Sequence, residues 1–120
     1  MMHIGELAER TDLSLRTLRH WDEVGLLRAS GRTEGGFRLY SPEDEQRVLL
    51  IRRMKPLGFT LEEMTELLAA LDASPRDPMA GLEESRATYF RDETERRREK
   101  IARQLTAADE FLALIGVHQA

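Results

Sequence analysis

SLRTLRHWDEVGLLRASGRTEGGFRLY, residues 14–40, is the stretch that decides the fold. It begins with Ser14, whose hydroxyl can cap a helix by accepting a hydrogen bond from an amide N–H one turn later. Gly25 is typical of the position that ends a helix, and the Leu-Leu pair after it can return to a core. Residues 32–40 alternate around a Gly-Gly pair, which is typical of a two-stranded hairpin. The stretch therefore predicts a short basic helix followed by a β-hairpin.

A shorter helix is expected before this stretch. Ile4, Leu7 and Ala8 recur at helical spacing, which predicts an amphipathic helix over residues 3–10 and a turn at residues 11–13. Two helices joined by so short a turn form a helix-turn-helix. In the second helix the expected inward side chains are Leu15, Leu18 and either Trp21 or Asp22, and the expected outward ones are Arg16, Arg19, His20 and Glu23.

Two further helices are expected after the hairpin. Ser41 followed by Pro42 and a run of acids is typical of a helix start, and residues 56–58, Pro-Leu-Gly, predict the end of that helix. Thr60 and Glu63 have the spacing of a capping box, which predicts the start of a fourth helix. The expected buried positions are Val48, Leu49, Ile51 and Met54 in the third helix and Met64, Leu67, Leu68 and Leu71 in the fourth.

The rest of the chain predicts a connector and one long helix. The first domain is expected to span residues 1–71, followed by a Pro- and Gly-containing connector at 72–81, a helix at 82–115 and a short tail at 116–120. Five apolar residues of the helix are spaced four, three, four and three, as in a coiled-coil seam. A helix of this length needs a packed stripe, so dimerisation is favoured over a solvated helix lying across its own core. The expected seam residues are Ile101, Leu105, Ala108, Leu112 and Ile115.

Charge is distributed unevenly along the chain. The 120 residues carry a formal net charge of −4, which by itself argues against a nucleic-acid partner. Residues 1–60 contain 10 basic and 9 acidic side chains, whereas residues 61–120 contain 8 basic and 13 acidic ones. Contact with phosphates depends on a local basic face rather than on the net charge. The arginines of residues 14–40 therefore keep DNA binding open.

A helix-turn-helix followed by a basic hairpin predicts a DNA-binding domain. The second helix fits the major groove, where its N-terminal side chains can reach base edges. Arg16 can bridge two guanine acceptors or neutralise a phosphate, and the sequence leaves both alternatives open. The Gly35-Gly36 tip allows close backbone approach with free amide donors, although an ordinary edge hairpin with solvated arginines is the alternative. The expected base-edge residues are Ser14, Arg16, Thr17 and His20, and the expected backbone contacts are Arg19, Trp21, Arg32, Gly36, Arg38 and Tyr40.

Three separated motifs carry a family resemblance. T-L-R-H-W-D-E-V-G-L-L at 17–27, R-T-E-G-G-F-R-L-Y at 32–40 and L-G-F-T-L-E-E-M at 57–64 closely resemble the MerR family of bacterial transcription regulators. The resemblance implies a mainly α fold with a small β-hairpin wing: a winged helix-turn-helix domain, a second wing formed by the third and fourth helices, and an antiparallel coiled-coil dimerisation helix. It also implies that a homodimer binds a pseudo-palindromic promoter and bends and untwists the DNA for RNA polymerase.

The resemblance also assigns contacts by position. The family usually has Tyr where this chain has Trp21, and an aromatic wall with one N–H donor is retained there. The implied recognition-helix contacts are Arg16, Thr17, Arg19, His20 and Trp21, the implied wing contacts are Arg38 and Tyr40, and the implied second-wing residues are Arg52 and Lys55.

No cofactor or metal site is expected. The chain has no cysteine, which excludes disulfides and the thiolate sites of metal-sensing relatives. His3, His20 and His118 are scattered, and we expect them at the surface or facing DNA. A small-molecule effector stays open, because a small pocket could form near residues 72–81, the aromatic pair 89–90 and the segment 111–120.

Other classes of protein are less well supported. The sequence has no phosphate-binding glycine motif, nucleophile elbow or H-E-x-x-H, so an enzyme is not expected. An architectural DNA binder would leave the long dimerisation helix unexplained, and a pure interaction protein would leave the basic helix and hairpin unexplained. The acidic N-terminal residues and the lack of a long apolar run predict a soluble, cytoplasmic protein without a signal peptide or membrane segment. The resemblance to DNA-binding regulators implies association with the bacterial nucleoid.

Overall fold

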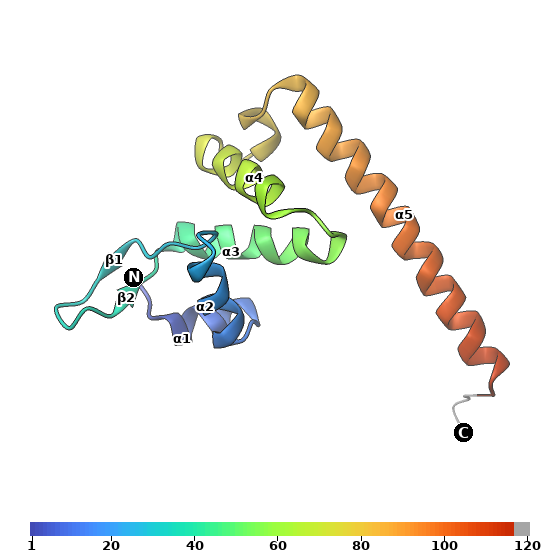
Figure 1. Cartoon of the computed structure of the whole chain (residues 1–120), viewed down its shortest axis with the longest axis horizontal. Coiled ribbons are helices and arrows are strands. Elements are labelled where there is room, and N and C mark those ends of the chain that lie inside the picture. The colour runs from blue at the N-terminus through green and yellow to red at the C-terminus, as the bar shows by residue number, and fades with distance from the viewer. Residues whose placement is uncertain (117–120) are drawn as a thin grey trace. The chain divides into compact units, whose positions relative to one another are not determined.

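Five α-helices and one two-stranded hairpin make up residues 1–116, the part of the chain that the computed structural model describes (Figure 1). The chain divides into two compact units: Met1–Gly81 and a second unit that begins at Leu82. The elements are α1 (Ile4–Thr11), α2 (Leu15–Glu23), β1 (Gly31–Arg32), β2 (Arg38–Leu39), α3 (Pro42–Met54), the 3₁₀ turn η1 (Lys55–Leu57), α4 (Leu61–Ala73), the 3₁₀ turn η2 (Pro78–Gly81) and α5 (Glu84–Leu114).

The helix-turn-helix is confirmed. Ser14 precedes α2 in extended conformation, and its Oγ accepts a hydrogen bond from the Thr17 amide at 3.0 Å. Leu18 and Trp21 form the buried side of α2, at 0% and 3% exposure. The expectation that Leu15 also faces inward was wrong, because this residue lies in the first turn of α2 and is 39% exposed.

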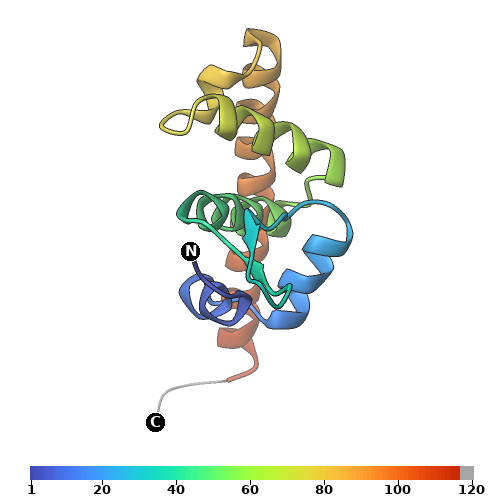
Figure 2. The same ribbon diagram turned by 90° about the vertical axis from the view of Figure 1, so that its left-hand side faces the viewer.

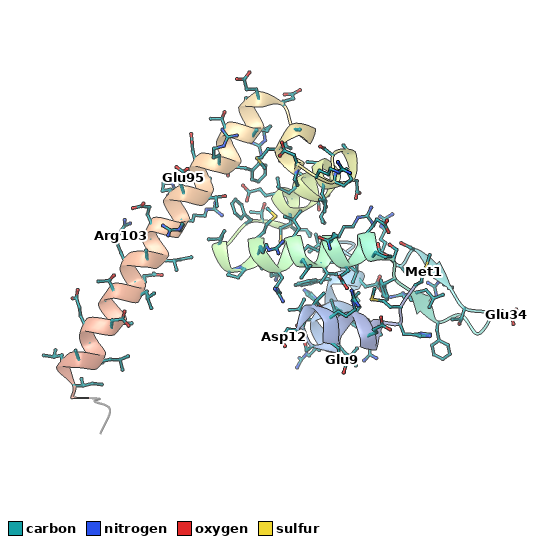
Figure 3. The ribbon with its side chains drawn as sticks, turned by 180° about the vertical axis from the view of Figure 1, so that it is seen from behind. Met1, Glu9, Asp12, Glu34, Glu95 and Arg103 are labelled. Atoms are coloured by element: carbon teal, nitrogen blue, oxygen red, sulfur yellow. The ribbon has the colours of Figure 1, made fainter. Side chains whose placement is uncertain are left out.

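The hairpin is antiparallel and has an additional partner. Its three-residue tip closes with the Gly36 amide donating to the Thr33 carbonyl at 2.9 Å, and Gly36 has a φ of +86°, which L side chains rarely adopt. At its base, Met2 and Tyr40 exchange two backbone hydrogen bonds of 2.8 Å each. The N-terminus therefore lies beside the base of the hairpin, and Glu34 lies at the opposite end (Figures 1 and 3).

Helix α3 lies between α4 and the α1–α2 pair in both views of the first unit (Figures 1 and 2). The predicted caps are confirmed: Ser41 and Thr60 each form a reciprocal capping box, with Asp44 and Glu63 respectively. The expected inward positions of both helices are buried except Leu49 and Leu71, which are half-buried. Local capping signals thus place both helices, and their apolar stripes then make the core of this unit.

The segment after α4 packs tightly on that helix. The turn η2 contacts α4, and a Cβ added to Gly81 would lie 2.5 Å from the Ala70 carbonyl oxygen. This glycine is therefore required by close backbone approach. Residues 78–81 are part of the packed first unit as well as a connector.

Helix α5 carries its exposed apolar residues in its C-terminal half. Ala87 and Phe90 are buried, whereas every residue from 101 to 116 is exposed in the single chain. Figure 3 shows side chains projecting outward along this helix, with Glu95 and Arg103 among them. Within residues 1–116, no helix combines the length and apolar character needed to span a membrane. The rest of the expected tail, residues 117–120 including His118, lies outside the described residues.

Candidate nucleic-acid interface

The outward face of α2 carries the predicted basic side chains. Arg16, Arg19 and His20 are exposed, and Thr17 is half-buried. The Ser14 hydroxyl is already engaged, since it accepts from the Thr17 amide and donates to the Thr17 Oγ1 at 2.9 Å. Three side chains of α2, two of them arginines, are thus available to a partner that lies along this helix.

A groove runs between α2, the start of α1 and the hairpin. This wing groove has a volume of about 260 Å³ and brings together three arginines: Arg19 from α2 and Arg32 and Arg38 from the hairpin. Phe37 lies at its edge and is 69% exposed. The sequence analysis missed Phe37, although an aromatic residue beside the Gly-Gly tip could have signalled it. The groove is lined by His3, Ile4, Arg19, Arg32, Gly36, Phe37, Arg38 and Tyr40.

Both hairpin arginines are held in place by other groups. Arg32 and Arg38 are directly opposite each other in the strand register, where two like charges repel. Arg32 Nη1 donates to the Gly36 carbonyl at 3.1 Å, and Arg38 forms an ion pair with Asp22 of α2. The Asp22 side chain is only 13% exposed, whereas that of Arg38 is 45% exposed. Asp22 therefore fixes the hairpin against α2 while the other side of the guanidinium faces solvent.

Two predicted contact residues lie in the core. Trp21 is 3% exposed and Tyr40 is fully buried. The Tyr40 hydroxyl has no hydrogen-bond partner among the described residues, and burial raises the pKa of this phenol. The expectation that this hydroxyl faces phosphates is corrected, because pairing with Met2 fixes the strand so that Tyr40 points inward. Trp21 is corrected likewise, as a core residue that only borders a cavity.

One further expectation is corrected by a hydrogen bond, and another hydrogen bond positions a predicted second-wing residue. The Gly36 amide closes the hairpin turn, so it is not a free donor. Arg52 Nη1 donates to the Thr11 carbonyl at the end of α1, which joins α3 to the helix-turn-helix, while Arg52 itself is exposed and stays a predicted DNA contact. Lys55 is exposed and lines a second cavity, of about 250 Å³, together with His20 of α2. Of the two second-wing residues, Lys55 is therefore the one that lies beside α2.

A buried carboxylate holds the root of the hairpin. Asp44 is fully buried and accepts hydrogen bonds from the Ser30 hydroxyl at 2.5 Å, the Ser41 amide at 2.8 Å and Arg47 Nη1 at 3.2 Å. Arg47 also donates from Nε to Asp72 at the end of α4, at 2.8 Å. Because Ser30 belongs to the loop before β1, Asp44 and Arg47 belong to α3, and Asp72 belongs to α4, this network ties the hairpin root to α3 and α4. The network thus fixes the base of the hairpin that carries Arg32 and Arg38.

One ion pair joins α1 to α3. Arg10 of α1 binds Glu45 of α3, and this hydrogen bond holds the pKa of the Glu45 carboxyl below its usual range. Among residues 1–116, no group of three or more His, Asp or Glu side chains could hold a metal ion.

Comparison with known protein families gives two overlapping matches. The sequence matches the family described as "MerR HTH family regulatory protein" over residues 2–71, more than half of its length. The chain belongs to the MerR family. A second family match, described as "MerR, DNA binding", covers residues 45–110 and so extends into α5.

Curated relatives of this MerR-family chain are similar over somewhat more than half of its length. The nodulation protein NolA of Bradyrhizobium elkanii is 51% identical over 65 residues, which are 54% of this chain and 30% of NolA. The HTH-type transcriptional regulator ZntR of Escherichia coli K12 is 44% identical over 69 residues, which are 58% of this chain and 49% of ZntR. The chain thus matches less than half of the length of either relative.

A solved MerR-family structure has a similar fold over most of the chain. HiNmlR, described as a MerR family regulator lacking the sensor domain and bound to promoter DNA, has a TM-score of 0.70 and 27% identity. The similarity covers 90% of this chain and 78% of that one. The predicted fold class, a mainly helical chain with a small hairpin and a long C-terminal helix, is confirmed.

Proposed function

We propose that this MerR-family chain is a sequence-specific transcription regulator that binds promoter DNA as a homodimer. The observation that carries the proposal is the wing groove beside the outward face of α2, where Arg19, Arg32 and Arg38 gather. Guanidinium groups in such a cluster match phosphate oxygens, while the exposed Arg16 and His20 on α2 can reach base edges. Lys55 adds a charge on the other side of α2.

The domain roles follow from this assignment. Residues 1–71 bind DNA, residues 72–81 connect, residues 82–115 dimerise and residues 116–120 form a tail. Support for dimerisation comes from the seam, because Ile101, Leu105, Leu112 and Ile115 are 43–63% exposed in the single chain and Ala108 is exposed as well. Pairing with a second copy would remove this apolar stripe from water, which is favourable.

The proposed mechanism uses the two-fold symmetry of such a dimer. Two α2 helices would enter successive major grooves of a pseudo-palindrome, about 34 Å apart or closer where the DNA is bent and untwisted. Changing the DNA shape would in turn alter access for RNA polymerase. The protein would act on the nucleoid in the bacterial cytoplasm, without enzymatic activity. Ligand screening tests whether it also binds a small-molecule effector.

The test begins with selection of bound sites from random duplexes. We expect an inverted repeat, and titration of that duplex and a random one at 50 and 200 mM salt should show a steep salt dependence. A protein with 6–10 phosphate contacts loses about 10³–10⁵ in affinity over this range. Weak binding with no preferred sequence and a shallow salt slope would reject the proposal and favour an interaction protein.

Two substitutions assign the roles of individual arginines. Arg19→Ala should weaken binding to both duplexes and lower the salt slope by about 0.9, the value for one phosphate. Arg16→Ala should relax base preference if Arg16 reads guanine, whereas equal losses on both duplexes would make it a phosphate contact. Arg76→Ala is the matched control, because Arg76 is also exposed but lines none of these cavities.

A further inference from the structure

A third cavity lies at the root of the hairpin, next to the wing groove. It has a volume of about 350 Å³ and is lined by the loop between α2 and β1, both residues of β1, one residue of α2 and one of β2. Two of the site residues predicted from the sequence, Arg32 and Arg38, line both this cavity and the wing groove. The lining residues are Asp22, Arg28, Ala29, Ser30, Gly31, Arg32 and Arg38.

The cavity combines three guanidinium groups with one carboxylate. Asp22 is paired with Arg38, which leaves the charges of Arg28 and Arg32 without an acidic partner among the described residues. Arg32 is oriented by its hydrogen bond to the Gly36 carbonyl. Arg28 is exposed and makes no hydrogen bond or ion pair with any residue of the described chain. An unpaired arginine beside two oriented ones leaves its donors available to an anion.

The floor of the cavity is fixed by the protein. The Ser30 amide donates to the Leu39 carbonyl at 2.9 Å, and the Ser30 hydroxyl donates to the buried Asp44. Ser30 is therefore held by both its backbone and its side chain, so the position of the cavity floor does not depend on a ligand. Such preorganisation lowers the entropy lost on binding.

We propose that Arg28, Arg32 and Arg38 form a phosphate-binding site at the root of the hairpin. A phosphate group accepts paired hydrogen bonds from the planar fork of arginine, and two uncompensated guanidinium charges favour a doubly charged group or two adjacent phosphates. The phosphate can belong to a DNA backbone or to a free phosphorylated small molecule. In the first case the inference rests on the proposed function, and the arginine track would extend from Arg19 to Arg28.

The first arm of the test uses inorganic pyrophosphate and needs no DNA. Titration of the full chain is followed by the NMR amide signals of Ser30 and Gly31. We expect saturable shifts that Arg28→Ala weakens about tenfold, the effect of losing one charged hydrogen bond. Arg28→Lys should keep part of the affinity, because it retains the charge but not the fork. Arg76→Ala should bind as the unmodified chain does.

The second arm measures DNA binding over a range of salt concentrations. If the site takes a backbone phosphate, Arg28→Ala lowers the salt slope by about 0.9 on selected and random duplexes alike, whereas Arg76→Ala does not. If the slope is unchanged while pyrophosphate still binds through Arg28, the site takes a free phosphorylated molecule. Equal behaviour of the two alanine variants in both arms would overturn the inference. A chain that binds no DNA would reject the proposed function but leave the pyrophosphate arm decisive.

Discussion

Replacing Tyr40 with Phe should stabilise the protein and leave DNA binding unchanged. The hydroxyl of this fully buried residue has no hydrogen-bond partner in the described chain. An unsatisfied buried polar group costs about 1–3 kcal/mol, and Phe removes it while keeping the ring. We expect a gain of about 1–2 kcal/mol, allowing for the small gap left by the oxygen. Each kcal/mol corresponds to a rise in Tm of about 4–8 °C for a domain of 60–100 residues.

The same substitution should change the response to alkaline pH. Burial raises the pKa of Tyr40 above its usual value near 10. Well below that pH the phenol is protonated in both the folded and the unfolded chain, so stability does not vary with pH through this group. Above it the unfolded chain ionises before the folded one, so stability falls as the pH rises. Tyr40→Phe removes this contribution. Denaturant unfolding at pH 8 and pH 11 should therefore show a larger difference between the two proteins at pH 11.

Thermal unfolding and DNA titration of the same Tyr40→Phe preparations complete the assay. Higher stability with an unchanged Kd is the expected result. A several-fold loss of affinity with an unchanged Tm would mean that the hydroxyl reaches the DNA, which would refute the reasoning from burial.

Three other changes test separate parts of the fold. Gly81→Ala should destabilise the first unit by about 1–3 kcal/mol in thermal unfolding, because its new Cβ would lie 2.5 Å from a carbonyl oxygen of α4. Gly5→Ala is the control: no atom lies near its new Cβ in the first turn of α1, so this change should be neutral or stabilising. Glu45→Gln should reduce stability at neutral pH and make the loss of stability between about pH 5 and 3 less steep. The Arg10 hydrogen bond lowers the pKa of Glu45, and its contribution to stability disappears as the carboxylate protonates. Identical acid unfolding profiles of the two proteins by circular dichroism would contradict this. Leu105→Asp should place a charge in the proposed seam and give a monomer by light scattering, and an unchanged mass would exclude the seam as the dimer interface.

Local signals made most of the fold predictable. Ser14, Ser41 and Thr60 each cap a helix with a partner three residues away, so the helix starts depend only on nearby sequence. The same holds for the Gly-Gly tip, whose backbone conformation requires glycine at position 36. The helix starts and the hairpin turn can be predicted from the sequence because no distant contact competes with these local interactions.

The contacts of individual side chains depend on distant parts of the chain. Tyr40 faces inward because Met2, far away in sequence, pairs with it and fixes the strand. Arg52 is similarly engaged by the end of α1, 41 positions away. The helical spacing predicts Asp22 only as a possible inward position of its helix, and no local pattern marks it as the partner of Arg38. Side-chain roles that rest on tertiary pairing are beyond what spacing can predict.

The exposed seam of α5 has a consequence for how the protein would respond to its own expression level. If two copies must pair through this helix before a two-fold site can be filled, occupancy at low protomer concentration rises with the square of that concentration. A doubling of expression would then increase occupancy about fourfold, by mass action alone. The residues that close the seam would therefore set a threshold for the genetic response without touching DNA.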